Sequence, residues 1–187
     1  MTSPPLMPPE TEATRLTERK EDLALEFTEH LEFTVRGKPV GKHMSVSIRN
    51  GHAFMYPSKG VGLYLKLVVE AARQERDLSR ESCQTPGPWP TFLPVFVTVE
   101  AFLPMAKSWP QSKQAASRGR LCTGKPDGDN ILKSVIDGIV GPKVAARTYE
   151  GILLHDDDQV AGLSIVKRWC DAGEERVEIT VRAVREP

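Results

Sequence analysis

The chain of 187 residues has little cysteine and no long apolar run. Its three cysteines, Cys83, Cys122 and Cys170, lie far apart, and no Cys-x-x-Cys pair is present. This argues against a disulfide framework and against a structural zinc site of the usual spacing. No apolar segment approaches the roughly twenty residues that span a bilayer, and residues 1–30 lack the apolar centre of a signal peptide. We therefore expect a soluble protein of a reducing, intracellular compartment and no membrane association.

Net charge is also absent, but the charges are unevenly distributed. Lysine plus arginine and aspartate plus glutamate each number 25, so the formal net charge is zero. Residues 1–32 hold eight acids and three bases, whereas residues 36–73 hold seven bases and one acid. Residues 101–126 hold no acid and five bases: Lys107, Lys113, Arg118, Arg120 and Lys125. A polyanion such as nucleic acid would be attracted to these stretches, although a solvated basic loop explains the charge equally well.

The composition, with 27% charged and 40% apolar residues, is typical of a folded globular domain. Residues 1–30 are acidic and begin with a proline-rich stretch, so we expect a partly disordered extension there. A surface helix could form over residues 11–30. Residues 31–187 then form a single domain.

Alternating apolar and polar residues predict the secondary structure of this domain. Strands are expected over residues 31–36, 95–103, 160–169 and 177–183, with a short extended segment at 52–56. Helical spacing of apolar residues predicts helices over 59–77 and 130–140, and loops over 79–94 and 105–124. The turn Asp171-Ala172-Gly173 predicts that the last two strands form a β-hairpin. Without regular βαβ alternation, this order predicts an α+β fold in which helices pack on a mixed β-sheet.

Aspartates cluster in two segments, Lys125-Pro126-Asp127-Gly128-Asp129-Asn130 before a predicted helix and Asp156-Asp157-Asp158-Gln159-Val160 before a predicted strand. Asp127 and Asp129 would project to one side of an extended chain, and Asp129 would be the N-cap of the helix.

The two segments could converge in space. Two carboxylates about 5 Å apart repel by about 3 kcal/mol at an effective dielectric constant of 20, so a convergent cluster favours a divalent ion such as Mg²⁺ or Mn²⁺. However, Asp-Gly-Asp-Asn is also good turn chemistry, and three consecutive aspartates commonly form a solvated loop tip.

Together the two segments resemble the RusA family of Holliday junction endonucleases. The resemblance rests on Lys125 to Lys133 with Asp137-Gly138, on Gly151 to Val160, and on Lys167, and it covers residues 31–184. Residues 35–40 also resemble the first strand and turn of the family. The resemblance implies a homodimeric, Mg²⁺-dependent nuclease, in which Mn²⁺ could replace Mg²⁺. It would nick four-way junction DNA symmetrically during recombination and repair, in the cytoplasm of a bacterium or in a phage context.

The resemblance also assigns roles to individual residues. Asp127, Asp129 and Asp157 would be catalytic metal ligands, and Asp156 a further ligand. Lys133 would be catalytic through a contact with the scissile phosphate, although the alternative is that it is an ordinary i,i+4 partner of Asp129 or Asp137.

Other residues receive lesser roles. Asp137 would be structural, and no role as a base is expected for His155. DNA phosphates would be bound by Lys107, Lys113, Arg118, Arg120 and Lys125.

Two other functions remain open from the residues. One is an Asp-x-Asp metal-dependent transferase, although the sequence has no glycine-rich phosphate loop or Walker motif. The other is a non-catalytic DNA-binding or partner-binding module whose aspartates only form turns.

Overall fold

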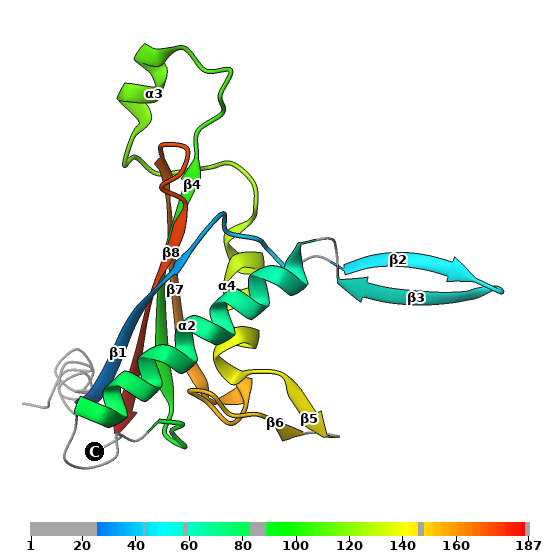
Figure 1. Ribbon diagram of the computed structural model, residues 1–187, viewed down its shortest axis with the longest axis vertical. Helices are drawn as coiled ribbons and strands as arrows, with labels where there is room; N and C mark the ends of the chain where they lie inside the picture. Colours follow the sequence, from blue (N-terminus) through cyan, green and yellow to red (C-terminus); the bar gives the residue numbers. More distant parts are fainter. Residues whose placement is uncertain (1–25, 43, 58–59, 83–88, 146–147, 186–187) are drawn as a thin grey trace, which may run out of the picture.

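A four-stranded mixed sheet forms the centre of the computed structural model, which describes residues 26–42, 44–57, 60–82, 89–145 and 148–185 (Figure 1). In spatial order its strands are β1 (Glu26–Arg36), β8 (Arg176–Arg185), β4 (Val95–Pro104) and β7 (Val160–Cys170). Strand β4 pairs antiparallel with β8 and parallel with β7. The predicted α+β fold with a mixed sheet is therefore confirmed.

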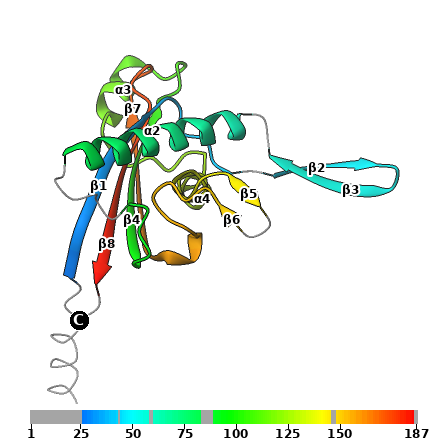
Figure 2. The same ribbon diagram turned by 60° about the horizontal axis from the view of Figure 1, so that its bottom comes forward.

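Two helices, α2 (Val61–Ser82) and α4 (Gly128–Val140), pack on one face of this sheet. Figures 1 and 2 show α2 running diagonally across the strands, with α4 beside it. The helix predicted over 59–77 is thus confirmed from residue 61 and continues into the first residues of the predicted loop 79–94. No helix among the described residues is long and apolar enough to cross a membrane.

The expected hairpin of the last two strands is wrong, because β4 lies between β7 and β8. Every second residue of β4, from Val95 to Leu103, is at most 1% exposed. A strand buried in this way gains most when it is paired on both edges. The link of residues 171–175 is long enough to pass the roughly 10 Å across one intervening strand.

The surface helix expected over residues 11–30 is wrong for residues 26–30, and the rest of it lies outside the described residues. Residues 26–30 instead lengthen β1, where Phe27 pairs with Val184 of β8. The Phe27 ring also contacts the edge of Phe96 at 5.7 Å between centroids. Pairing with a distant strand therefore outweighs the local helical pattern.

A two-stranded ribbon projects from the body (Figure 2) and consists of β2 (Met44–Arg49) and β3 (His52–Pro57). Asn50 and Gly51 form its turn with positive φ angles of 51° and 76°. An Asn-Gly dipeptide is a strong hairpin signal, but only the second strand was expected.

The described residues also form four short elements: α3 (Gln111–Ser117), β5 (Lys143–Ala145), β6 (Thr148–Tyr149) and the 3₁₀ turn η1 (Asp157–Gln159). Helix α3 lies inside the loop expected over 105–124, so that loop is only partly irregular.

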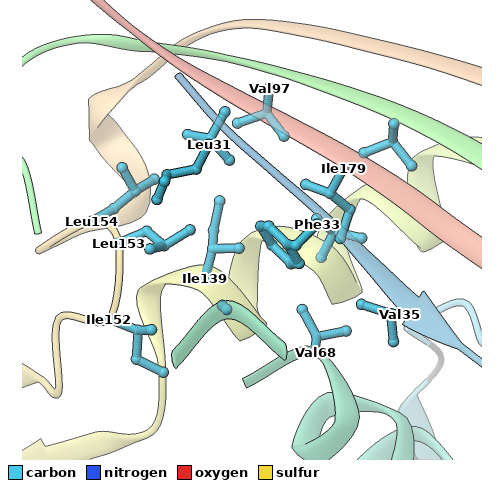
Figure 3. Close-up of a cluster of buried hydrophobic side chains, with 14 of the residues drawn as sticks. Leu31, Phe33, Val35, Val68, Val97, Ile139, Ile152, Leu153, Leu154 and Ile179 are labelled. Atoms are coloured by element: carbon cyan, nitrogen blue, oxygen red, sulfur yellow. The ribbon is translucent and has the colours of Figure 1, made fainter. Parts of the chain in front are cut away.

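The hydrophobic core fills the space between the sheet and the two helices (Figure 3). Phe33 of β1 and Ile179 of β8 meet Val68 of α2 and Ile139 of α4 there. The segment Ile152-Leu153-Leu154, which is fully buried, closes one end. Because this segment leads directly into η1, the core fixes where the second aspartate segment begins.

Candidate active site

The first aspartate pair begins helix α4. Asp127 is the N-cap residue, although its side chain makes no capping hydrogen bond, and Asp129 lies in the first turn. The expectation that Asp129 is the N-cap, in an extended stretch, is therefore wrong: the helix begins at Gly128, two residues earlier than predicted. Both carboxylates still lie at the helix N-terminus, where the helix dipole stabilises negative charge.

Each of these two carboxylates has a lysine partner. Lys125 Nζ lies 2.6 Å from Asp127 Oδ2, and Lys133 Nζ lies 3.1 Å from Asp129 Oδ2. The hydrogen bond from Lys133 holds the pKa of Asp129 below its ordinary value. Asp129 is therefore ionised at neutral pH and free on its solvent side to bind a cation.

A third lysine, Lys167 of β7, fastens the loop that precedes Asp127. Its Nζ donates to the carbonyl oxygen of Gly124 at 2.7 Å and to that of Pro126 at 2.9 Å. Nearby, the backbone N–H of Lys42 donates to the carbonyl oxygen of Asn130 at 2.8 Å. The N-terminus of α4 is thus held from the sheet on one side and from the β1–β2 link on the other.

The second aspartate segment is built around a capping box. Asp156 caps η1 and accepts from the backbone N–H of Asp157 at 2.7 Å. The Gln159 Oε1 atom accepts in return from the backbone N–H groups of His155 and Asp156 at 2.7 and 3.0 Å. The spacing Asp-Asp-x-Gln is therefore explained locally, because its first and last residues satisfy the backbone of a tight turn.

Asp157 lies in a region of concentrated negative charge. A side-chain hydrogen bond with Asp156 raises its pKa above the ordinary value, and partial burial and the charges of Asp156 and Asp137 raise the pKa further. A neighbouring cation would offset these effects and lower the pKa of Asp157 again. Hard carboxylate oxygens are the donors that Mg²⁺ and Mn²⁺ prefer, so the chemistry of this set fits a divalent ion.

A cavity of about 690 Å³ opens beside Asp157, between α2 and the C-terminal half of α4. Asp137 lines it as well, together with the cations Lys42, Lys66 and Arg73. Two of these cations are paired: Lys42 Nζ lies 2.6 Å from Asp137 Oδ2, and Arg73 Nε lies 3.0 Å from Glu150 Oε1. Lys66 is exposed and forms no ion pair with a described residue.

The two aspartate segments lie toward opposite ends of α4. Asp129 and Asp137 are eight residues apart on this helix, which is about 12 Å along its axis. Asp157 lines the same cavity as Asp137. In the part of the chain that the structure describes, no three His, Cys, Asp or Glu side chains are grouped so that they could hold a metal ion. The structure therefore joins Asp156 and Asp157 to Asp137, and leaves Asp127 and Asp129 with their lysines.

The basic loop lies at the other end of the sheet from η1 (Figure 1). Lys113 lies over the Trp109 ring at 3.9 Å, and that ring packs against Trp169 at 5.1 Å between centroids. Arg118 pairs with Asp171. The other two bases of this loop, Lys107 and Arg120, are exposed and form no ion pair with any residue that the structure describes.

Sequence reasoning missed the cations of the cavity. Lys42, Lys66 and Arg73 all belong to the basic stretch 36–73, which was the available signal. That signal does not show which side of a helix faces a cavity, because the packing of α2 on α4 decides it.

The side chain of His155 lies beside the second aspartate segment. Its Nε2 atom is buried and has no hydrogen-bond partner among the described residues. The side chain instead stacks on Phe92, with centroids 3.9 Å apart.

Comparison with known proteins gives one clear match. The family model of endodeoxyribonuclease RusA matches residues 36–182. No curated protein matches the chain. The family match decides against the transferase and the non-catalytic module. Since it spans well over half of the sequence, the chain belongs to the RusA family of Holliday junction resolvases, endonucleases that hydrolyse phosphodiester bonds of DNA.

Proposed function

We propose that this endonuclease cuts four-way junction DNA by symmetric, Mg²⁺-dependent nicking, with Mn²⁺ as a substitute. The observation that carries the proposal is the cavity where Asp137 and Asp157 lie together with Lys42, Lys66 and Arg73. Carboxylates suit a divalent ion, and the cations suit the phosphate oxygens on either side of a scissile bond. We further propose that it acts in the cytoplasm, in a bacterial or phage context.

The proposed metal ligands are Asp127, Asp129 and Asp157, with Asp156 assisting. Because the two aspartate segments lie toward opposite ends of α4, a shared ion requires them to move closer together when metal and DNA bind. When bound, a divalent cation supplies an activated water and stabilises the leaving oxygen. Asp157 would hold its charge in that state, because the cation offsets the repulsion from Asp156 and Asp137. Lys133 fixes the orientation of Asp129 and balances charge near the phosphate, while Lys42 and Lys66 bind the non-bridging oxygens.

The basic loop supplies a second, distant contact with DNA. Lys107 and Arg120 are available for phosphates, whereas Lys113 and Arg118 exchange their present partners for them, and Lys125 contacts phosphate beside Asp127. Each lost contact of this kind reduces the salt dependence of binding by about one unit of slope. Their distance from η1 suits an extended arm of DNA lying along the sheet.

A homodimer would match the near-twofold symmetry of a junction that needs two cuts. The β2–β3 ribbon supports this, because Val46, Ile48 and Met55 on one of its faces are 60%, 76% and 66% exposed. A two-stranded ribbon is marginal in water by itself, and a second copy would cover this face. Sedimentation tests this: Val46→Ser with Ile48→Ser should give monomers, whereas the control Leu78→Ser should not. Unchanged dimers in the double variant would contradict the proposed interface.

The cleavage experiment uses neighbouring aspartates of η1. Asp157→Asn should bind a synthetic four-way junction at least as tightly as the wild type, since a negative charge near phosphate is lost, and should not cut it. Asp158→Asn is the matched control and should cut normally, because Asp158 has no assigned ligand role. Normal Mg²⁺-dependent cutting by Asp157→Asn, or cutting by the wild type in excess chelator, would contradict the proposal.

A further inference from the structure

An exposed aromatic ring lies next to the second aspartate segment. Phe92, in the segment before β4, is 82% exposed, although its neighbour Thr91 is only 2% exposed. Its ring stacks on His155, with centroids 3.9 Å apart and planes inclined by 14°. One face of Phe92 is therefore covered by a second ring, and the other is open to solvent.

The backbone on both sides of Phe92 is fixed. The Thr91 N–H donates to the carbonyl oxygen of Leu153 at 3.1 Å, and the Leu93 N–H donates to Thr91 Oγ1 at 3.1 Å. Gln159 Nε2 donates to the carbonyl oxygens of Thr91 and Leu93, at 2.7 and 3.3 Å. The exposed ring thus sits on an anchored segment rather than on a loose loop.

The same glutamine connects this ring to the proposed active site. While its Nε2 atom binds the carbonyl groups around Phe92, its Oε1 atom accepts from the backbone N–H groups of His155 and Asp156. One side-chain amide therefore sets the position of Phe92 relative to Asp157. A molecule that contacts the ring would therefore be held beside the second aspartate segment.

The chemistry of the surroundings selects the occupant. Residues 89–94 and 155–160 contain no lysine or arginine, so these two segments offer no cation that would hold a phosphate against the ring. A flat, uncharged nucleobase matches the open ring, because bases of every kind stack on aromatic side chains. Base faces are available where stacking is interrupted, as at a branch point, and not within continuous duplex.

We propose that Phe92, supported by His155, is a stacking platform for a nucleobase that is unstacked next to the scissile phosphate. This inference rests on the proposed function and deepens it, because it supplies a preference for branched over linear DNA. Phe92 is a specificity residue in this account and takes no part in the hydrolysis.

The test places 2-aminopurine, a fluorescent base that reports stacking, at the positions flanking the cut in a four-way junction. Titration without Mg²⁺ prevents cutting. Wild-type protein and Phe92→Tyr should change the fluorescence, whereas Phe92→Ala and Phe92→Leu should not. The last two should also lose about tenfold of the preference for junction over linear duplex. All variants should melt as the wild type does, because the ring is mostly exposed.

The outcomes separate the platform from the nuclease. An identical fluorescence change with Phe92→Ala would overturn the platform even if the wild type nicks junctions normally in Mg²⁺. A fluorescence change that depends on Phe92, without any nicking of the junction by the wild type in Mg²⁺, would instead overturn the proposed function. A change in sedimentation of DNA-free Phe92→Ala would assign the ring to a protein interface and overturn the platform.

Discussion

Replacing Gly138 with alanine should destabilise the protein, although alanine is usually the better helix residue. A Cβ atom at this position would lie 2.3 Å from Val68 Cγ1 and 2.6 Å from Val68 Cβ. Val68 is fully buried in α2, so it has no space into which to move. Extra volume in a packed core costs about 1–3 kcal/mol, and a contact this short belongs near the upper end. The gain in helix propensity is about 1 kcal/mol, which leaves a net loss of about 2 kcal/mol.

Urea denaturation followed by circular dichroism measures this difference. Gly62→Ala in α2 is the matched control, because a Cβ atom there has no neighbour within 4 Å and should stabilise by up to about 1 kcal/mol. Combining Gly138→Ala with Val68→Ala should recover at least about 1 kcal/mol relative to the sum of the single changes. Equal or greater stability of Gly138→Ala would show that the close crossing of α2 and α4 is wrong. The cavity lies between the same helices, so junction cleavage should fall in this variant and not in Gly62→Ala.

Three further predictions concern single side chains and the metal. Tyr64→Phe should raise the free energy of unfolding by about 1 kcal/mol. The Tyr64 hydroxyl is buried without a hydrogen-bond partner among the described residues, and burial raises its pKa. Tyr56→Phe is the exposed control, and a loss of stability in Tyr64→Phe would contradict this account. Lys167→Met should slow cleavage more than Lys143→Met does, because Lys167, unlike Lys143, holds the loop before Asp127. Equal cleavage rates of the two variants would show that Lys167 does not position this loop for catalysis. Millimolar Mg²⁺ should raise the melting temperature of the wild type and not that of Asp157→Asn, and equal shifts in both would place the ion elsewhere.

The strands and helices of the core could be predicted because each repeats its apolar pattern over many residues. Helix α4 is the clearest case, with its buried residues at helical spacing. The order of the strands could not be predicted, because nothing in β7 or β8 shows that β4 lies between them. The Asn50-Gly51 turn was visible in the sequence, so β2 could have been found.

The candidate site divides in the same way. Asp156 and Gln159 could be predicted from spacing, since they form a local capping box. The position of Asp137 near Asp157 depends on the contact of α4 with η1, and that of Lys66 and Arg73 depends on how α2 packs. These are tertiary contacts, which a motif does not contain.

The central claim is that carboxylates at both ends of α4 act on one metal-dependent cut, even though Asp127 and Asp157 belong to separate segments. Electron paramagnetic resonance of Mn²⁺, titrated into protein bound to an uncut junction analogue, measures this most directly. We predict that Asp127→Asn and Asp157→Asn each weaken binding of the same ion, whereas Asp158→Asn leaves it unchanged. Mn²⁺ binding that is insensitive to Asp127→Asn but lost in Asp157→Asn would contradict a shared site.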